Sequence, residues 1–302
     1  MQVPQKRPYH INRIMPYLLI FPTFAIIVIF LFYPMANVFR YSLFRYNISK
    51  PYVNGFTGLD NFIKILTDDP IFWGSLWVSM KWVLWTISVQ LVFGMILALV
   101  LNKQFRCRGL FRTILFSPWA VSGILTSMLW ILLYNEHMGF INNALIDSGL
   151  WAQGIAWTAN MNTVFGAIVV AETWRGLPFF IIILLAALQS IPTEIYESAN
   201  IDGAGPIRMF WYITLHFLKS TIIFATLLRI IWEFNNIDLI YTITKGGPSN
   251  ATLTLGMYTI NKAIKSGEFG YGSALNIVSF FIILIFIGVY LKLTKYSQEV
   301  TK

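Results

Sequence analysis

The feature that most constrains this chain is a set of six apolar stretches, each about 20 residues long. A helix rises about 1.5 Å per residue, so about 20 apolar residues cross the hydrocarbon core of a bilayer. The clearest stretch, 273–293, carries no charge before Lys292, whereas 210–234 holds basic and acidic side chains. The predicted spans are 14–36, 82–101, 113–134, 163–189, 210–234 and 273–293.

The composition agrees with a membrane protein built of helices. Only 12% of the residues are charged, which is about half the share in a soluble domain. In lipid, only helices and closed barrels satisfy their backbone polar groups, and the alternating pattern of barrel strands is absent from the sequence. The first stretch lacks a small-residue cleavage site, which favours a retained helix over a signal peptide. The sequence therefore predicts an all-α polytopic membrane protein with six transmembrane helices.

The distribution of lysine and arginine predicts the orientation, because cytoplasmic loops are enriched in them. Segment 103–112 holds four of these residues, whereas 135–161 holds none. Both termini are therefore expected in the cytoplasm, with a tail of 1–13, a six-helix transmembrane domain of 14–293 and a tail of 294–302. The net charge of +9 fits this orientation and contact with anionic lipid. No basic stripe with interleaved aromatic residues indicates nucleic-acid binding.

A polar segment, 190–209, returns to the cytoplasmic side between the fourth and fifth spans. Its sequence predicts a short helix over 192–202, because Pro192 suits a first helical turn. Glu194 lies where the helix dipole favours an acidic side chain. Gly203 is a natural stop signal, since glycine readily takes the left-handed conformation that ends helices.

This predicted helix has two different faces. One carries Ile191, Ile195 and Ala199, and the other carries Glu194, Glu197 and Ile201. Such a helix can dock into a groove on a partner protein. The alternative is a helix that lies on lipid headgroups, but interfacial helices are typically basic. The segment is acidic up to Arg208, which favours a protein partner.

The same segment resembles the motif of a known family. Glu197-Ser198-Ala199, Asp202-Gly203-Ala204 and Ile213-Thr214-Leu215 look like the EAA…G…I-LP loop of ABC-importer permeases. Two residues depart from the family pattern, since Ser198 replaces an alanine and His216 stands where proline is usual. The resemblance implies a coupling helix that seats in a cleft of a cytoplasmic ATPase. The residues implied in this coupling are Glu194, Glu197, Ser198, Ala199, Asp202 and Gly203.

The resemblance covers most of the chain, in the family's order. The segments similar to carbohydrate-importer permeases of the maltose-transporter type are FTGLDNF (56–62), DDPIFWGSL (68–76), SPWAVSGILTSMLW (117–130), ETWRGLPFFIIILLAALQSIP (172–192), WEFNNIDLIYTITKGGPSNAT (232–252) and FGYGSALNI (269–277). Run 234–248 resembles the first permease of a two-permease pair. The resemblance therefore implies the type I ABC importer permease fold and a sugar or oligosaccharide substrate.

It also implies partners in a bacterial plasma membrane. These are a second, homologous permease that completes a heterodimeric pore, a cytoplasmic ABC ATPase dimer and an extracellular solute-binding protein. The sequence has no phosphate-binding loop, so ATP and Mg²⁺ are expected on the partner ATPase, with no cofactor on this chain. Neither a metal-ligand spacing nor a nucleophile–base–acid pattern predicts an enzyme.

Charged residues inside the predicted spans are costly and need an explanation. Glu172 and Arg175 lie three positions apart, and Arg229 and Glu233 four apart, so each pair can meet on one helix face. One interpretation is mutual neutralisation inside the bundle, and the other is a wet cavity that contacts sugar hydroxyls. The first is the preferred interpretation, and TWRGLP (173–178) supports the second, because its glycine and proline predict a broken helix there.

Sugars are recognised by aromatic faces and by amide or carboxylate groups. Residues of these kinds in segments that line the pathway in the family are Trp174, Arg175, Trp232, Glu233, Asn235, Asn236 and Asn276. The tryptophans at 73, 77, 82 and 85 are interpreted instead as anchors at the membrane interface.

Three rival functions fit the residues less well. A secondary transporter would need related halves, which the six unequal spans do not show. A membrane-embedded enzyme lacks a catalytic constellation. An importer of glycerol phosphate or another polyol derivative would favour extra basic residues, but Arg175 and Arg229 both have acidic neighbours.

Overall fold

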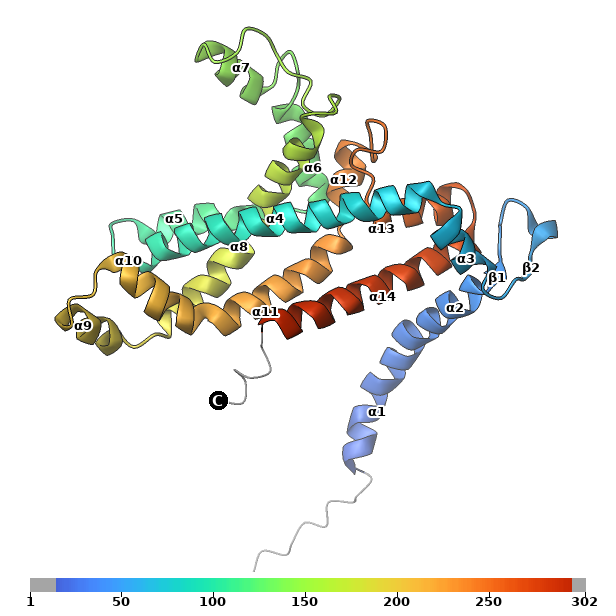
Figure 1. Ribbon diagram of the computed structural model, residues 1–302, viewed down its shortest axis with the longest axis horizontal. Helices are drawn as coiled ribbons and strands as arrows, with labels where there is room; N and C mark the ends of the chain where they lie inside the picture. The colour runs from blue at the N-terminus through green and yellow to red at the C-terminus, as the bar shows by residue number, and fades with distance from the viewer. Residues whose placement is uncertain (1–14, 295–302) are drawn as a thin grey trace, which may run out of the picture.

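The computed structural model describes residues 15–294 of the chain, which are mostly helical (Figure 1). The predicted tail 1–13 and all but the first residue of the predicted tail 294–302 lie outside the described residues. The elements before the loop at 190–192 are α1 (Met15–Ile27), η1 (Val28–Phe32), α2 (Tyr33–Ser42), β1 (Phe44–Arg45), η2 (Pro51–Val53), β2 (Gly55–Phe56), α3 (Asp60–Thr67), α4 (Pro70–Asn102), α5 (Arg108–Phe116), η3 (Ser117–Ala120), α6 (Gly123–Leu133), α7 (Phe140–Asp147) and α8 (Val164–Gln189). Those after it are α9 (Thr193–Ile201), α10 (Pro206–Met209), η4 (Phe210–Thr214), α11 (Leu215–Phe234), α12 (Asp238–Ile243), α13 (Leu255–Ile260), η5 (Asn261–Lys265) and α14 (Phe269–Thr294).

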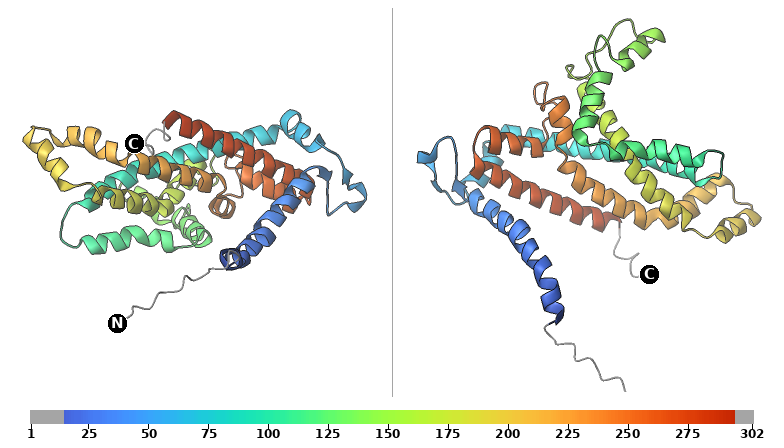
Figure 2. Two further views of the ribbon diagram at one scale, coloured as in Figure 1. Left: turned by 90° about the horizontal axis from the view of Figure 1, so that it is seen from below. Right: turned by 180° about the vertical axis from the view of Figure 1, so that it is seen from behind.

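The long helices α4, α8, α11 and α14 form the body of the molecule (Figures 1 and 2). The most extensive contact is between α4 and α8, and α11 packs on both. Gly94 permits this contact, because a side-chain carbon there would lie 2.6 Å from Cβ of Phe180. Small residues at helix crossings are favoured in membranes, where close packing rather than the hydrophobic effect joins helices.

Within residues 15–294, five helical segments are long and apolar enough to cross a membrane, or six if one bent pair counts as a span. The second begins at Pro70, well before the expected start at residue 82. The bent pair joins Arg108–Ala120 to Gly123–Leu133 at 104°. The predicted span 113–134 therefore contains a sharp bend and is not one straight helix. The break follows Pro118, where the chain forms a 3₁₀ turn and then two extended residues.

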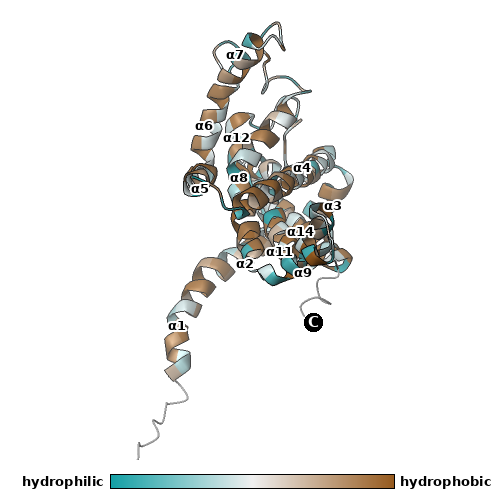
Figure 3. Cartoon of the chain, turned by 90° about the vertical axis from the view of Figure 1, so that its left-hand side faces the viewer, coloured by the Kyte–Doolittle hydropathy of each residue, from teal (hydrophilic) through white to brown (hydrophobic). Residues whose placement is uncertain are grey.

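The segment α1–η1–α2 packs on α14 through α2, and α1 diverges from the other helices (Figures 1 and 2). Its most apolar window has no buried residue, although it has the hydropathy of a membrane span. Figure 3 shows hydrophobic residues along this segment and over the outside of the bundle. Such exposure is unfavourable in water but ordinary where lipid or another membrane subunit covers the surface.

The two ends of the bundle carry different structures (Figure 1). Helix α9 lies at one end, and the antiparallel pair β1–β2 lies at the other. Strand residues Phe44 and Arg45 pair with Phe56 and Gly55, respectively. The hairpin, α3 and the start of α4 together form the end opposite the predicted coupling helix.

Asp69 joins three helices at this end. Its Oδ1 accepts hydrogen bonds from the backbone N–H groups of Ile71 and Phe72, at 3.1 Å each, and so caps α4. Its Oδ2 accepts from the hydroxyls of Tyr258 on α13, at 2.6 Å, and Tyr271 on α14, at 2.5 Å. Burial alone would raise the pKa of Asp69, but these hydrogen bonds outweigh it and hold the pKa below its ordinary value.

We expect Asp69→Ala to lower the thermal midpoint of the detergent-solubilised chain at pH 7. The change removes an N-cap, which contributes about 1 kcal/mol. It also removes two hydrogen bonds to a charged group, and each of these contributes about 1.5–3 kcal/mol. The folded pKa is lower than the unfolded one, so this stabilisation is present above about pH 4 and is lost as the pH falls through the folded pKa. The difference in thermal midpoint between the variant and the wild type should therefore become smaller at acidic pH.

Asp68→Ala is the matched control, because the Asp68 side chain is exposed and makes no hydrogen bond or ion pair within the described residues. Thermal unfolding followed by tryptophan fluorescence between pH 3 and pH 8, that is, on both sides of about pH 4, would measure both. Equal losses for the two variants would contradict the role assigned to Asp69.

Candidate functional site

Helix α9 lies close to the predicted bounds of 192–202. It runs from Thr193 to Ile201, with Pro192 as its N-cap residue. Gly203 adopts a left-handed φ of 74°. The N–H groups of Gly203 and Ala204 donate to the carbonyl groups of Asn200 and Ala199, at 3.0 and 2.9 Å. The helix thus ends at the glycine that the sequence indicated, in the way glycine-terminated helices commonly end.

The two predicted faces of α9 are present. Ile191 is buried just before the helix, and Ile195 and Ala199 are half-buried. On the other face Glu194, Glu197, Ser198, Ile201 and Asp202 are exposed, with Ile201 at 87%. The exposed face is therefore acidic, with one large apolar side chain at its end. An acidic side chain beside an exposed apolar one is a suitable surface for a protein partner.

Tyr196 links α9 to the next membrane-spanning segment. Its hydroxyl lies 3.0 Å from Oγ1 of Thr214, which is buried at the end of the π-helical turn η4. Tyr196, Leu188 at the end of α8 and Leu99 near the end of α4 line a cavity of about 640 Å³ with residues of α10 and η4. His216, which stands where the family usually has proline, lies two residues after the end of η4. The departure from regular α-helix in η4 therefore does not require a proline.

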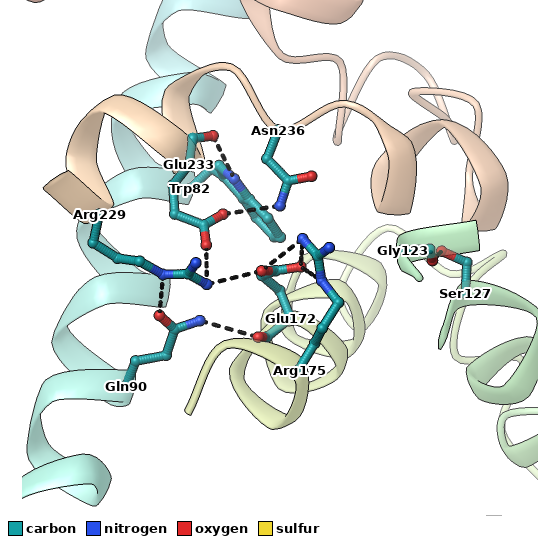
Figure 4. Close-up of polar contacts among 9 residues, drawn as sticks. All are labelled: Trp82, Gln90, Gly123, Ser127, Glu172, Arg175, Arg229, Glu233 and Asn236. Atoms are coloured by element: carbon teal, nitrogen blue, oxygen red, sulfur yellow. Dashed lines mark hydrogen bonds and ion pairs between the residues drawn. The ribbon is translucent and has the colours of Figure 1, made fainter. Parts of the chain in front are cut away.

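A network of charged and amide side chains joins α4, α8 and α11 (Figure 4). Arg175 donates two hydrogen bonds to Glu172, both 2.9 Å. Arg229 reaches Glu172 at 3.0 Å and Glu233 at 2.5 Å through Nη2, and donates to Gln90 at 2.9 Å through Nε. The Gln90 amide in turn donates to the backbone carbonyl of Glu172 at 3.0 Å.

The four charges of the network cancel. Glu172, Glu233 and Arg229 are buried, and the side chain of Arg175 is 22% exposed. Both predicted ion pairs, at three and four positions, are present, but Arg229 also bridges between them. Removing one partner from such a pair leaves a buried charge unpaired, which costs about 3–5 kcal/mol. The network thus fixes how the three helices pack.

The expectation of a broken helix at 173–178 is wrong, because α8 continues from Val164 to Gln189. Pro178 is accommodated inside the helix, as is common where neighbouring helices surround the backbone. Gly176 does not break the helix, but it lets the side chains of Arg229 and Gln90 approach the α8 backbone closely. A side-chain carbon there would collide with Nη2 of Arg229 and Nε2 of Gln90. Arg229 therefore occupies the space that a side chain at position 176 would need.

Two members of the network were misread or missed in the sequence. Trp82 was interpreted as an interface anchor, but it is 1% exposed and its indole N–H donates to the carbonyl of Glu233 at 3.1 Å. The other three tryptophans of that group, at 73, 77 and 85, are exposed. Gln90 was not singled out. A glutamine inside an apolar span is a signal that could have identified it.

The predicted pathway residues fall into separate groups. Asn235 and Asn276 line one cavity of about 620 Å³, together with Asn37, Tyr41 and Thr259. Glu233 and Asn236 belong to the network, where Asn236 donates to Glu233 at 3.2 Å. Arg175 is bound to Glu172, as described above.

The two tryptophans of the predicted pathway are not among the residues that line this cavity. The ring of Trp174 packs edge-on against Trp130 at 6.2 Å, and the ring of Trp232 packs against Phe179 at 5.2 Å. The described residues therefore do not bring all seven predicted side chains to one site.

Comparison with known proteins decides the family. Residues 90–295 match the family described as binding-protein-dependent transport system inner membrane component. The chain belongs to this family. Over 286 residues it is 36% identical to the trehalose/maltose transport system permease protein of Thermococcus litoralis, with 94% of each chain covered. It is 33% identical to the sulfoquinovosyl glycerol transport system permease protein of Agrobacterium fabrum, with 94% of this chain and 91% of that protein covered.

The fold of this family member agrees with a solved structure. A chain of the bacterial alginate ABC transporter, crystallised in complex with an alginate pentasaccharide-bound periplasmic protein, superposes with a TM-score of 0.81. The identity is 20% and 95% of each chain is covered, so the likeness shows the type I ABC importer permease fold. The chain is therefore a multi-pass permease subunit of a binding-protein-dependent ABC importer, which works with an ATPase and a solute-binding protein.

For this permease we expect Gly176→Ala to weaken both stability and transport. The added carbon displaces Arg229 from its acidic partners, which should cost about 3 kcal/mol or more in the free energy of unfolding. Gly166→Ala, on the same helix, is the matched control, because a side-chain carbon there meets nothing within 4 Å. Thermal midpoints and substrate uptake of the reconstituted transporter would measure both variants. A Gly176→Ala variant as stable and active as Gly166→Ala would contradict the structural role of the network.

Proposed function

We propose that this permease carries a neutral sugar or oligosaccharide into the cell. Two full-length relatives are permeases for trehalose/maltose and for sulfoquinovosyl glycerol, and this likeness over 94% of the chain carries the proposal of a sugar substrate. Sulfoquinovosyl glycerol bears a sulfonate group, so the choice of a neutral sugar rests on the charge balance of this chain. In this proposal the chain forms half of the pore, and a second, homologous permease forms the other half. A cytoplasmic ATPase dimer binds ATP and Mg²⁺, and an extracellular protein delivers the sugar.

The charge balance inside the bundle supports a neutral substrate. Arg175 and Arg229 are the two arginines of the charge network, and both are bound to Glu172, with Glu233 as a second partner of Arg229. No cation of this network is therefore left to hold a phosphate ester. The cavity that holds Asn235 and Asn276 instead presents amides, hydroxyls and aromatic rings. These groups bond sugar hydroxyls and cover the apolar faces of sugar rings.

The exposed face of α9 supports coupling to the ATPase. Glu194, Glu197 and Asp202 place three acidic side chains there, and Ser198 keeps the surface between them small. Ala199 faces the bundle, and Gly203 turns the chain back toward η4. The helix is attached to the bundle at both ends but is exposed along one side. It can therefore bind in a cleft of a partner while it stays packed against the bundle.

The route from α9 into the bundle is short. Tyr196 meets Thr214 at the end of η4, and α11 begins at the next residue and carries Arg229 and Glu233. A displacement of α9 is thus passed to the helix that holds two members of the charge network. ATP binding has to favour one state of the transporter by several kcal/mol to shift the population almost completely. A continuous helix between the two contacts is a suitable element for this.

The orientation follows the same proposal, with α9 and both termini in the cytoplasm. The end of the bundle that carries α9 also carries the basic segment 103–112 and Arg208. Basic residues concentrate on the cytoplasmic side.

The first test is purification of the tagged chain from its native membrane, followed by identification of every stoichiometric companion. The proposal expects a P-loop ATPase, a second permease and, after addition of the binding protein, uptake of a neutral oligosaccharide into vesicles that contain ATP. Uptake without any ATPase would contradict coupling. Transport of a phosphate ester in preference to neutral sugars would contradict the substrate class.

Glu197→Lys should leave the assembled transporter intact in the membrane but separate ATP hydrolysis from uptake, because it reverses a charge on the docking face. The expected loss of uptake is at least about tenfold, since one charge-pair contact at an interface contributes 1.4 kcal/mol or more. Glu136→Lys makes the same charge change at an exposed site outside this loop. Full uptake by Glu197→Lys, or an equal loss in Glu136→Lys, would overturn the assignment of α9.

Tyr196→Phe tests the link between α9 and η4. Removing the hydroxyl leaves the ring in place but removes its hydrogen bond to Thr214. We expect ATPase activity to persist while the sugar molecules imported per ATP fall about two- to tenfold, as expected for one lost hydrogen bond. Tyr212→Phe is the control, because that tyrosine is 76% exposed and makes no hydrogen bond within residues 15–294. An unchanged import-to-hydrolysis ratio in Tyr196→Phe would exclude this route.

A further inference from the structure

Two arginines of α5 converge on a single neutral group. Arg108 and Arg112 lie four positions apart and direct their Nη2 atoms at Gln189, the last residue of α8. With its amide oxygen facing α5, Gln189 accepts from Arg108 at 2.8 Å and from Arg112 at 3.0 Å. Because one oxygen serves both guanidinium groups, their positive charges are held close together.

Within the part of the chain that the structure describes, no acidic side chain balances this pair. Among residues 15–294, neither Arg108 nor Arg112 forms an ion pair, and the Nε atoms of both are buried without a hydrogen-bond partner. The sequence has no aspartate or glutamate between Lys103 and Glu136. Like charges four residues apart destabilise a helix, so the arrangement is incomplete without an anion.

The position of the pair indicates which anion is available. Helix α5 lies at the end of the bundle that carries α9 and α10 (Figure 1). Beside the arginines, α5 exposes Leu110, Phe111 and Ile114, at 60, 51 and 58%. A phospholipid supplies both matching parts, an acyl chain for the apolar side chains and a phosphate for the arginines. Arginine is well suited to phosphate, because its planar fork donates two parallel hydrogen bonds.

We propose that Arg108, Arg112 and Gln189 form a binding site for the phosphate group of an anionic phospholipid, between the start of α5 and the end of α8. Basic pockets between membrane helices at the cytoplasmic side are known to bind such headgroups. The lipid neutralises the arginine pair and fastens α5 to α8 immediately before the loop that leads into α9. The position of α9 relative to the bundle would therefore depend on which lipids are present.

The experiment uses the assembled transporter, delipidated in detergent and titrated with phosphatidylglycerol or phosphatidylcholine, with bound lipid counted by native mass spectrometry. The proposal expects preferential binding of phosphatidylglycerol and a roughly 30-fold loss of affinity in the double variant Arg108→Gln/Arg112→Gln. The matched control, Lys50→Gln/Lys265→Gln, removes two exposed positive charges outside α5 and should bind like the wild type.

Three results would overturn the proposal. One is equal affinity for phosphatidylglycerol in the arginine variant and the control. Another is displacement of the lipid by an equal concentration of inorganic phosphate, which would assign the site to the free ion. The third is lipid binding only after the ATPase is removed, which would mean that the arginines pair with the ATPase. If the glutamine variant fails to assemble, Arg108→Lys/Arg112→Lys tests the planar fork instead of the charge, because it keeps both charges. Affinity for phosphatidylglycerol equal to that of the wild type would then overturn the proposal.

Discussion

The position of Arg229 between Glu172 and Glu233 is the interaction on which the helix bundle depends. In a membrane the hydrophobic effect does not press apolar helices together, so close packing and polar contacts decide which faces meet. One guanidinium here satisfies acidic groups from two helices and an amide from a third. The absence of a side chain at Gly176 provides the space. Rotation of α8 or α11 would leave at least one buried charge unpaired, and rotation of α4 would remove the Gln90 amide from Arg229, so the network favours a single packing.

The same helix connects this network to the exposed loop. Thr214 contacts Tyr196 just before α11 begins, and Arg229 and Glu233 lie near its far end. The π-helical turn η4 lies between the loop and the regular helix, and such turns are frequent at functional sites. In the proposed coupling, a movement of α9 would displace α11 and so alter the hydrogen bonds and ion pairs of the network. Arg229 bonds Gln90 on α4 and Glu172 on α8, so a displacement of α11 would also affect these two helices.

The sequence predicted what is local and missed what depends on distant contacts. The two faces of α9, its stop at Gly203 and the ion pairs at three and four positions follow from helical periodicity, so residue spacing was sufficient. Gly176 and Pro178 are typical helix breakers in isolation, but α8 continues because its neighbours compensate. The burial of Trp82 and the role of Gln90 depend on α11, which is remote in sequence. The sequence around Trp82 and Gln90 alone therefore could not reveal their contacts with α11.

The distribution of charge shows which surfaces a single chain leaves unsatisfied. Inside the bundle the network is neutral, so the helices need no outside ion to hold together. At the end near α9, acidic side chains face outward on one helix and unpaired arginines converge on another. The most apolar part of the segment α1–η1–α2 likewise has no buried residue. Acidic, basic and apolar surfaces require three different complements. In the proposals made above, the acidic face of α9 binds a protein, and the arginine pair and the apolar surface bind lipid.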